Sequence, residues 1–276
     1  MPTELEQPGS SFHVWAEGYE GLLYDDHDAR FRSLIYGWDT GDRSAQIRAV
    51  IPAQGAVWGF LAQGTATIAS AGARPRAIHE VEFFVTANGA ELILPPGARL
   101  FAVQQIGFLA IPLIGGPIEP RGRLRYFDGC SDSLLVPPPV AGEPCLNHLH
   151  FPPNIVQTRH THPSIRAGII ARGTGSCTTG SGVALLRSGL IFVIPTSCIH
   201  GFQTSSERMD VIAYHPDSNH GPRHEDHPMI NRTLVEGRKI DNSLGPHLKA
   251  EVIESRFRVD LCEPNHLPSS GSRTDP

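Results

Sequence analysis

Short apolar runs separated by Gly, Pro, Asp and Asn recur along most of the chain. Runs of about four to eight residues rich in Val, Ile, Phe and Leu are typical of β-strands. Stretches with helical periodicity are scarce. We expect strands at residues 33–36, 57–61, 81–85, 91–94, 108–113, 146–151, 165–171, 183–187, 190–194 and 210–214, and one short helix at 248–256. The pattern predicts an all-β fold.

The same arrangement of strands and turns occurs twice. An apolar strand that ends in Gly-Thr occupies residues 57–65 and again 166–174, an offset of 109 residues. A second strand, which starts at Gly and ends at Pro, occupies residues 89–95 and again 189–195, an offset of 100 residues. Self-similarity of this kind indicates repeated structural units. We therefore expect two similar domains in tandem.

The repeat and the composition between its copies divide the chain into four parts. We expect an N-terminal domain at 1–130, a Pro- and Gly-containing linker at 131–144, and a C-terminal domain at 145–230. The remaining residues, 231–276, are expected to form an extension that contains the short helix and ends in a disordered Ser-, Pro- and Gly-containing tail.

Composition narrows the functional classes. The formal net charge of −5 gives no indication of nucleic acid or an anionic membrane surface as a partner. No apolar run approaches the ~20 residues of a membrane-spanning helix, and the acidic start lacks a signal-peptide core, so we expect a cytoplasmic protein. Five cysteines without CxxC spacing are typical of free thiols. Histidine is unevenly distributed, because eleven of fourteen lie at or after position 148.

The strongest chemical motif is His160-Thr161-His162, followed forty residues after His160 by a third histidine, His200. Side chains two apart on a strand point to the same face, so His160 and His162 can meet an imidazole from a distant strand. Three imidazoles around one point form a first-row metal site with open positions for substrate, water or O2. Neutral imidazole suits Fe, Zn, Mn, Ni and Cu alike, so the ligand type does not select the metal.

The spacing of these residues resembles that of the cupin superfamily. The first cupin motif, G-x5-HxH-x3,4-E-x6-G, is matched in its spacing over residues 160–173, and the second, G-x5-PxG-x2-H-x3-N, over residues 189–204. The resemblance implies double-stranded β-helix (jelly-roll) barrels. Together with the internal repeat it implies two such barrels in tandem, a bicupin, and a homodimer, which is common among bicupins.

Several positions depart from the cupin motifs. Asn154 stands where the first Gly is expected. Ser197 replaces a Gly and Thr204 replaces an Asn, and a loop tolerates both replacements. More importantly, Arg166 stands where the family has a Glu ligand, and a guanidinium has no lone pair to offer a cation. What remains is a three-histidine site, which resembles those of cysteine dioxygenase and the β-diketone-cleaving dioxygenases.

The N-terminal repeat has lost the ligand positions. The two offsets place Ile51, Ala53 and Leu100 where the three histidines stand in the second copy. Apolar side chains offer no ligand atom to a metal ion. We therefore expect the N-terminal domain to bind no metal and to serve packing or dimer formation.

Other side chains are candidates for the pocket around the metal. Phe202 and Tyr214 either line it or belong to the core. His150 either serves as a proton-transfer group or, with His148, points outward because the apolar face of its strand points inward. The His-rich segment 215–228 either caps the mouth of the barrel or forms a solvated loop.

The leading expectation is a metal-dependent oxygenase of the dioxygenase type. The resemblance implies one Fe(II) on His160, His162 and His200, with O2 and a small anionic or enolisable substrate. Arg166 would hold the substrate anion if it faces the cavity; otherwise it turns outward or pairs with a buried acid. The alternatives are a non-redox isomerase, lyase or hydrolase that uses Zn, Mn or Ni on a small carboxylate or sugar-like substrate, and a cupin that binds a small molecule without catalysis.

Overall fold

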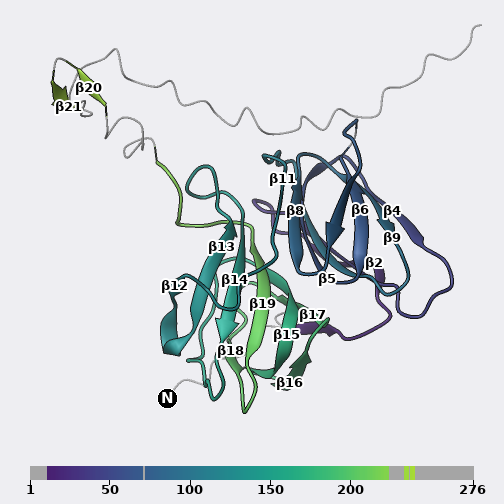
Figure 1. Ribbon diagram of the computed structural model, residues 1–276. Helices are drawn as coiled ribbons and strands as arrows, with labels where there is room; N and C mark the ends of the chain where they lie inside the picture. Colours follow the sequence, from purple (N-terminus) through teal and green to yellow (C-terminus); the bar gives the residue numbers. More distant parts are fainter. Residues whose placement is uncertain (1–10, 71, 224–232, 236, 240–276) are drawn as a thin grey trace, which may run out of the picture.

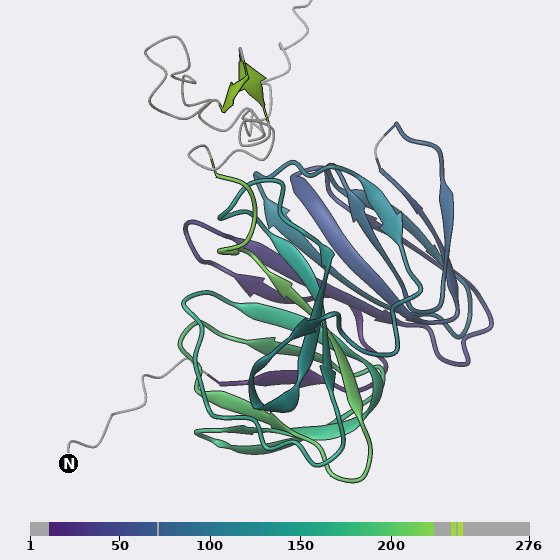
Figure 2. The same cartoon turned by 60° about the vertical axis from the view of Figure 1, so that its left-hand side comes forward.

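Two β-barrels lie side by side in the protein (Figure 1 and Figure 2). The computed structural model describes residues 11–70, 72–223, 233–235 and 237–239. Within these residues the regular secondary structure is strand, apart from the three-residue 3-10 helix η1 (Phe127–Gly129). The predicted all-β fold is confirmed. This part of the chain contains no helix that is long and apolar enough to cross a membrane.

The N-terminal barrel consists of two antiparallel sheets. The larger has the strand order β11-β8-β5-β10-β3-β2, and the smaller has the order β4-β9-β6-β7. The bounds of these strands are β2 Glu20–Asp26, β3 Ser33–Asp39, β4 Ile47–Ile51, β5 Gly55–Gln63, β6 Thr65–Ala69, β7 Arg76–His79, β8 Glu82–Thr86, β9 Ala90–Leu94, β10 Arg99–Ile106 and β11 Leu113–Gly115.

The C-terminal barrel is built on the long strand β15. The main path of its sheet is β1-β17-β15-β19-β14-β13-β12, while β16 and β18 pair with the far half of β15. Strands β20 and β21 pair antiparallel in a separate two-stranded sheet. The bounds are β1 His13–Trp15, β12 Leu124–Arg125, β13 Ser131–Val136, β14 Cys145–Phe151, β15 Arg166–Thr179, β16 Gly182–Arg187, β17 Ile191–Ile194, β18 His200–Gln203, β19 Met209–His215, β20 Leu234–Val235 and β21 Arg238–Lys239.

The second barrel takes strands from outside the predicted range 145–230. Strand β1 pairs with β17, so the start of the chain crosses to the C-terminal barrel. Strand β13 pairs with β14, so the first part of the predicted linker at 131–144 belongs to the sheet. Neither segment is recognisable from its own residues, because β1 is three residues long and β13 begins Ser-Asp-Ser. These two segments are strands because they pair with neighbouring strands, and this pairing cannot be recognised from local composition.

All but one of the predicted strands coincide with observed strands over most of their length. The exception is 108–113, of which only Leu113 lies in a strand. Pro112 has no N–H to give to a ladder, and the ring of Phe108 packs 5.8 Å from that of Trp58. The apolar character of this segment therefore reflects packing between the barrels. The predicted helix at 248–256 and the predicted disordered tail lie outside the described residues.

Apolar side chains form separate cores inside each barrel and a third between them. Inside the N-terminal barrel, Ile51 and Leu100 are 1% and 0% exposed. Ala53, the third position that matches a histidine, lies at the surface. The N-terminal counterpart of the histidine site is thus filled by hydrocarbon, whereas the C-terminal barrel keeps polar groups in its interior.

A buried hydrogen bond links the two barrels. The hydroxyl of Tyr214 on β19 donates to Oε1 of Gln105 on β10 at 2.6 Å. The ring of Tyr214 also lies 5.4 Å from that of Trp58 on β5. The outer face of β19 is therefore fixed against the N-terminal barrel.

Replacing Tyr214 by Phe should lower the free energy of unfolding by about 1–3 kcal/mol, because Gln105 keeps a buried acceptor without a donor. Urea denaturation of the whole chain measures this change. Tyr36→Phe is the matched control, since the Tyr36 hydroxyl has no hydrogen-bond partner in the described part of the chain. Equal effects of the two substitutions would contradict the prediction.

Candidate metal centre

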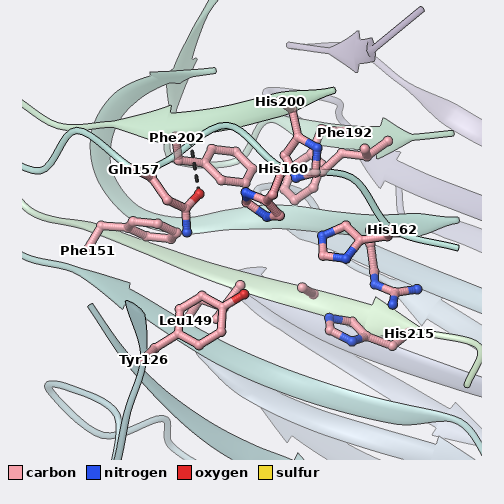
Figure 3. A pocket seen from close by; sticks show the side chains of 13 residues that line it. Tyr126, Leu149, Phe151, Gln157, His160, His162, Phe192, His200, Phe202 and His215 are labelled. Carbon is pink, nitrogen blue, oxygen red and sulfur yellow. Dashed lines mark hydrogen bonds between the residues drawn. The ribbon is translucent and has the colours of Figure 1, made fainter. Parts of the chain in front are cut away.

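Three imidazoles converge on one point inside the C-terminal barrel (Figure 3). One nitrogen from each of His160, His162 and His200 lies within 4.8 Å of the other two. The ring centroids are 4.4 Å apart for His160 and His200, 5.0 Å for His160 and His162, and 5.1 Å for His162 and His200. Among the described residues, no other group of three or more His, Cys, Asp and Glu side chains has a spacing suited to a metal ion.

Backbone pairing holds two of these histidines together. The N–H of His160 donates to the carbonyl of His200 at 2.9 Å, and the N–H of His200 donates back at 3.0 Å. His160 lies in an extended segment with this one bridge, so the strand predicted there is an isolated β-bridge. In the turn before β18, Ser197 has a φ of 62°, a conformation that favours the Gly of the cupin motif. Its N–H donates to the carbonyl of His162 at 2.9 Å.

Hydrogen bonds on the far side of two rings orient them toward the centre. Nδ1 of His160 lies 2.8 Å from the carbonyl of Thr158, and Nδ1 of His200 lies 3.0 Å from the carbonyl of Cys198. A carbonyl only accepts, so both Nδ1 atoms carry the proton and both Nε2 atoms keep a free lone pair.

Burial keeps the rings of His162 and His200 neutral. It is the largest cause that lowers the pKa of His162 to about 3 and that of His200 to about 4. Three imidazole nitrogens that converge on one point are a donor set that fits a first-row divalent metal.

A small pocket opens over the three histidines, with a cavity volume of about 30 Å³. Most of its wall is aromatic or aliphatic, and an amide, a phenol and a guanidinium add polar groups. Nε2 and Oε1 of Gln157 are fixed because Oε1 accepts a hydrogen bond from the N–H of Phe202 at 3.2 Å (Figure 3). The lining residues are Tyr126, Leu149, Phe151, Gln157, His160, His162, Arg166, Phe192, Ile194, His200, Phe202, Ala213 and His215.

Arg166 lies in the pocket wall, on the inner face of β15, and is 8% exposed. Its Nη1 donates to Oγ of Ser164 at 2.6 Å and to the carbonyl of Ile165 at 2.8 Å, and it lies 3.4 Å from Oδ1 of Asp217. Nε is buried without a partner, and no hydrogen bond of Nη2 to a described residue exists. The guanidinium is therefore held by one nitrogen, and Nη2 is available to a ligand.

Of the three side chains considered as possible pocket residues, Phe202 lines the pocket, and Tyr214 and His150 lie elsewhere. Tyr214 faces the N-terminal barrel, and His150 points away from the pocket. The cause is the two-residue period of β-strands. Leu149 and Ala213 take the inward positions on β14 and β19, so their neighbours in sequence point outward.

His150 belongs to a buried polar cluster on the outer face of the sheet. Nδ1 of His150 and Nε2 of His148 lie 2.7 Å and 3.2 Å from the same atom, Oδ1 of Asp210. Asp210 is 0% exposed. The predicted alternative that these two histidines point outward is the one that the structure shows.

The sequence motifs missed His215, Tyr126 and Gln157, which line the pocket. His215 was grouped with the His-rich segment 215–228, although it is the last residue of β19 and shares its inward face with Ala213. Its ring centroid lies 6.4 Å from that of His162. The period of the strand, extended by one residue, would have placed it. Of the remaining segment, residues 216–223 are described, and 224–228 lie outside the described residues.

Comparisons by sequence find no relative. No protein-family model matches the chain, and no curated protein matches it.

Comparisons of structure find many similar proteins. Salicylate 1,2-dioxygenase from Pseudaminobacter salicylatoxidans superposes with a TM-score of 0.52 at 11% identity, over 76% of this chain and 85% of that one. A mutant form of the same enzyme superposes with a TM-score of 0.54 at 11% identity, over 77% and 86%. A cupin 2 conserved barrel domain protein from Leptotrichia buccalis gives a TM-score of 0.48 at 14% identity, over 76% and 91%.

At such low identity the likeness concerns the fold alone. It agrees with the sheets of the two barrels and with the motif spacing in the second. The chain is therefore an all-β protein with two jelly-roll barrels in tandem, a fold that it shares with salicylate 1,2-dioxygenase.

Proposed function

We propose that the protein is a metal-dependent enzyme whose C-terminal barrel holds one divalent metal on His160, His162 and His200. The observation that carries this proposal is the convergence of three imidazole nitrogens within 4.8 Å of one another beneath a pocket. The N-terminal barrel has Ile51 and Leu100 at two of the equivalent positions, so we propose that it binds none.

The proposed activity is that of an oxygenase of the dioxygenase type, with Fe(II) as the metal and a small anionic or enolisable substrate. Bound iron would supply redox chemistry with O2, whereas Zn, Mn, Ni or Cu in the same place would act mainly as a Lewis acid. The chain's own residues bind and orient the substrate. Nη2 of Arg166 faces a substrate carboxylate or enolate, and the aromatic wall holds a planar body away from water.

The fold likeness to salicylate 1,2-dioxygenase supports an oxygenase without establishing it, because it concerns the fold alone. Three neutral ligands leave the full charge of the metal uncompensated by the protein, which favours an anionic substrate. Arg166 adds a second cation to the same pocket. The positive charges of the metal and of Arg166 therefore support an anionic substrate.

Metal analysis of anaerobically purified protein, followed by O2-uptake measurements with diketones, phenolic acids and thiols, tests the activity. Iron together with substrate-dependent O2 uptake is the expected result. Zinc, manganese or nickel with turnover but no O2 uptake would favour a non-redox isomerase, lyase or hydrolase. Metal and ligand binding without turnover of any compound would favour a binding protein.

Replacing Arg166 by Leu should weaken binding of a small carboxylate by about 2–5 kcal/mol, roughly 30-fold or more, because the anion loses its buried ion-pair partner. Calorimetric titration of the metal-loaded protein with salicylate as the probe measures the change. Arg166→Lys keeps the charge but loses the planar fork, so its effect should be intermediate.

Arg187→Leu is the matched control, since this arginine is 46% exposed and pairs with Glu17 at the surface. Metal content must be the same in all variants for the comparison to concern the substrate. Unchanged salicylate affinity in Arg166→Leu, with metal retained, would contradict the role of this side chain.

A further inference from the structure

A second cavity lies between the two barrels, with a volume of about 240 Å³. One wall comes from β5 and β8 of the N-terminal barrel, another from the loop before β11, and the third from the end of β13 and the loop after it. This volume is close to the lower end of the range of small-molecule sites, about 300–1,000 Å³. The lining residues are Trp58, Val85, Phe108, Leu109, Ala110, Ile111, Leu113, Val136, Pro137, Pro139, Val140, Glu143 and Pro144.

This inter-barrel pocket is too large to be a packing defect. Protein interiors are packed to crystal-like density, and voids larger than a water molecule are few. Its walls are also fixed. The Trp58 ring is packed between Phe108 and Tyr214, at 5.8 Å and 5.4 Å, and three prolines restrict the backbone of the opposite wall.

The wall is apolar except at two points. Glu143 is the sole ionisable residue among the lining side chains. Its Oε2 accepts a hydrogen bond from the N–H of Val140 at 3.1 Å, and Oε1 has no donor among the described residues. Trp58 is 2% exposed, and its Nε1–H is buried without an acceptor in the described part of the chain. The pocket therefore offers one free acceptor on a hydrocarbon surface, and the unpaired donor beside it is buried within the wall.

The mouth of the pocket is apolar as well. Two of its lining side chains are exposed to solvent, Ile111 at 66% and Val140 at 41%. Isolated exposed apolar residues are ordinary, but here they border a cavity that is itself apolar. An apolar molecule would bury both the cavity wall and this border.

We propose that the inter-barrel pocket binds a small, largely apolar molecule whose one polar group donates a hydrogen bond to Glu143, and that it rejects anions. The specificity is opposite to that of the pocket over the histidines, where Arg166 favours an anion. The two pockets lie on opposite faces of β19. Tyr214 packs on Trp58 toward the inter-barrel pocket, while Ala213 and His215 face the histidines.

Two fluorescent probes that share the same aromatic body test this proposal. N-phenyl-1-naphthylamine is neutral and has one N–H donor, and 8-anilinonaphthalene-1-sulfonate adds a sulfonate. The neutral probe should bind the full chain at one site and receive excitation energy from Trp58. The sulfonate should bind about tenfold or more weakly, because its charge meets Glu143 in an apolar wall.

Variants of the wall decide whether binding occurs in this pocket. Ala110→Phe fills the cavity and should remove binding of the neutral probe, and Glu143→Gln should narrow the difference between the two probes. Should Ala110→Phe fail to fold, Ile111→Arg places a large side chain at an exposed position of the mouth and should weaken binding. Trp58→Phe should keep the probe bound but lower the total energy transfer from tryptophan to the probe.

Each contrary outcome overturns the proposal. Absence of probe binding in the folded chain would mean that the pocket is closed or already covered. Binding that falls as protein concentration rises would mean that a second copy of the chain covers it. Equal binding by wild type, Ala110→Phe and Ile111→Arg would place the probe elsewhere. The test does not depend on metal, so metal-free and metal-loaded protein should bind the probe equally.

Discussion

Replacing His160 and His162 together by alanine should abolish stoichiometric metal binding. The variant keeps one of the three convergent nitrogens, and one imidazole does not hold a divalent ion against water. The substitution should leave the barrel folded, because His160 and His162 are only partly buried and their backbone hydrogen bonds remain. Elemental analysis after metal loading and desalting measures the loss.

The matched control removes two histidines from the N-terminal barrel. His27 and His79 are exposed and belong to no cluster with metal-compatible spacing in the described part of the chain. His27→Ala/His79→Ala should therefore bind metal as wild type does. Full occupancy in the His160→Ala/His162→Ala variant would remove the basis of the site assignment.

Replacing Asp210 by alanine should lower the free energy of unfolding by about 3–5 kcal/mol, the typical effect of breaking a buried charged interaction. Oδ1 of Asp210 is 2.7 Å from His150 and 3.2 Å from His148, and Nε of Arg208 is 3.6 Å from Oδ2. Without the carboxylate, two imidazoles keep buried nitrogens with no partner. Urea denaturation at pH 7 measures the change, with Asp42→Ala, at an exposed position, as control.

The same carboxylate should make stability depend on pH. Burial, the largest single cause, raises the pKa of Asp210, but hydrogen bonds and charge from His148 and His150 outweigh it, and the net pKa lies below its ordinary value. A lowered pKa in the folded state adds stability above the ordinary aspartate pKa, and this stability is lost as pH falls through the folded value. The difference between wild type and Asp210→Ala should shrink over that acidic range. A difference that stays constant would contradict the assignment.

Sequence alone predicted the histidine cluster because the cupin spacing is local. The segment 160–173 and the segment 189–204 each carry their own turns, and the backbone pair between His160 and His200 joins them. The motif identified Arg166 as a candidate, but it did not predict which way the Arg166 side chain points. The inward face of β15 depends on which neighbours pack against it, which spacing does not state.

Side-chain facing is the feature that the sequence left open. Tyr214 and His150 were each given two alternatives, facing the pocket or not, because each strand has two faces. The outer faces of β14 and β19 are also buried, because the N-terminal barrel and a polar cluster cover them. When both faces of a strand are buried, hydrophobicity no longer distinguishes inside from outside.

Long-range pairing accounts for the remaining differences. Strand β1 joins the C-terminal barrel although it is far from its partner strand in the sequence. In the sheet, His13 pairs with Val193. The segment 108–113 is apolar because Phe108 packs on Trp58 between the barrels. Neither contact leaves a periodic signal within the segment itself.

The central claim is that one metal ion binds to three histidines in the second barrel and none binds in the first. Anomalous diffraction from metal-loaded crystals, with data on both sides of the absorption edge of the metal, tests it most directly. We predict a single peak in each chain, about 2.0–2.3 Å from Nε2 of His160, His162 and His200. Absence of a peak between these atoms in metal-replete crystals, or a peak inside the N-terminal barrel, would contradict the account.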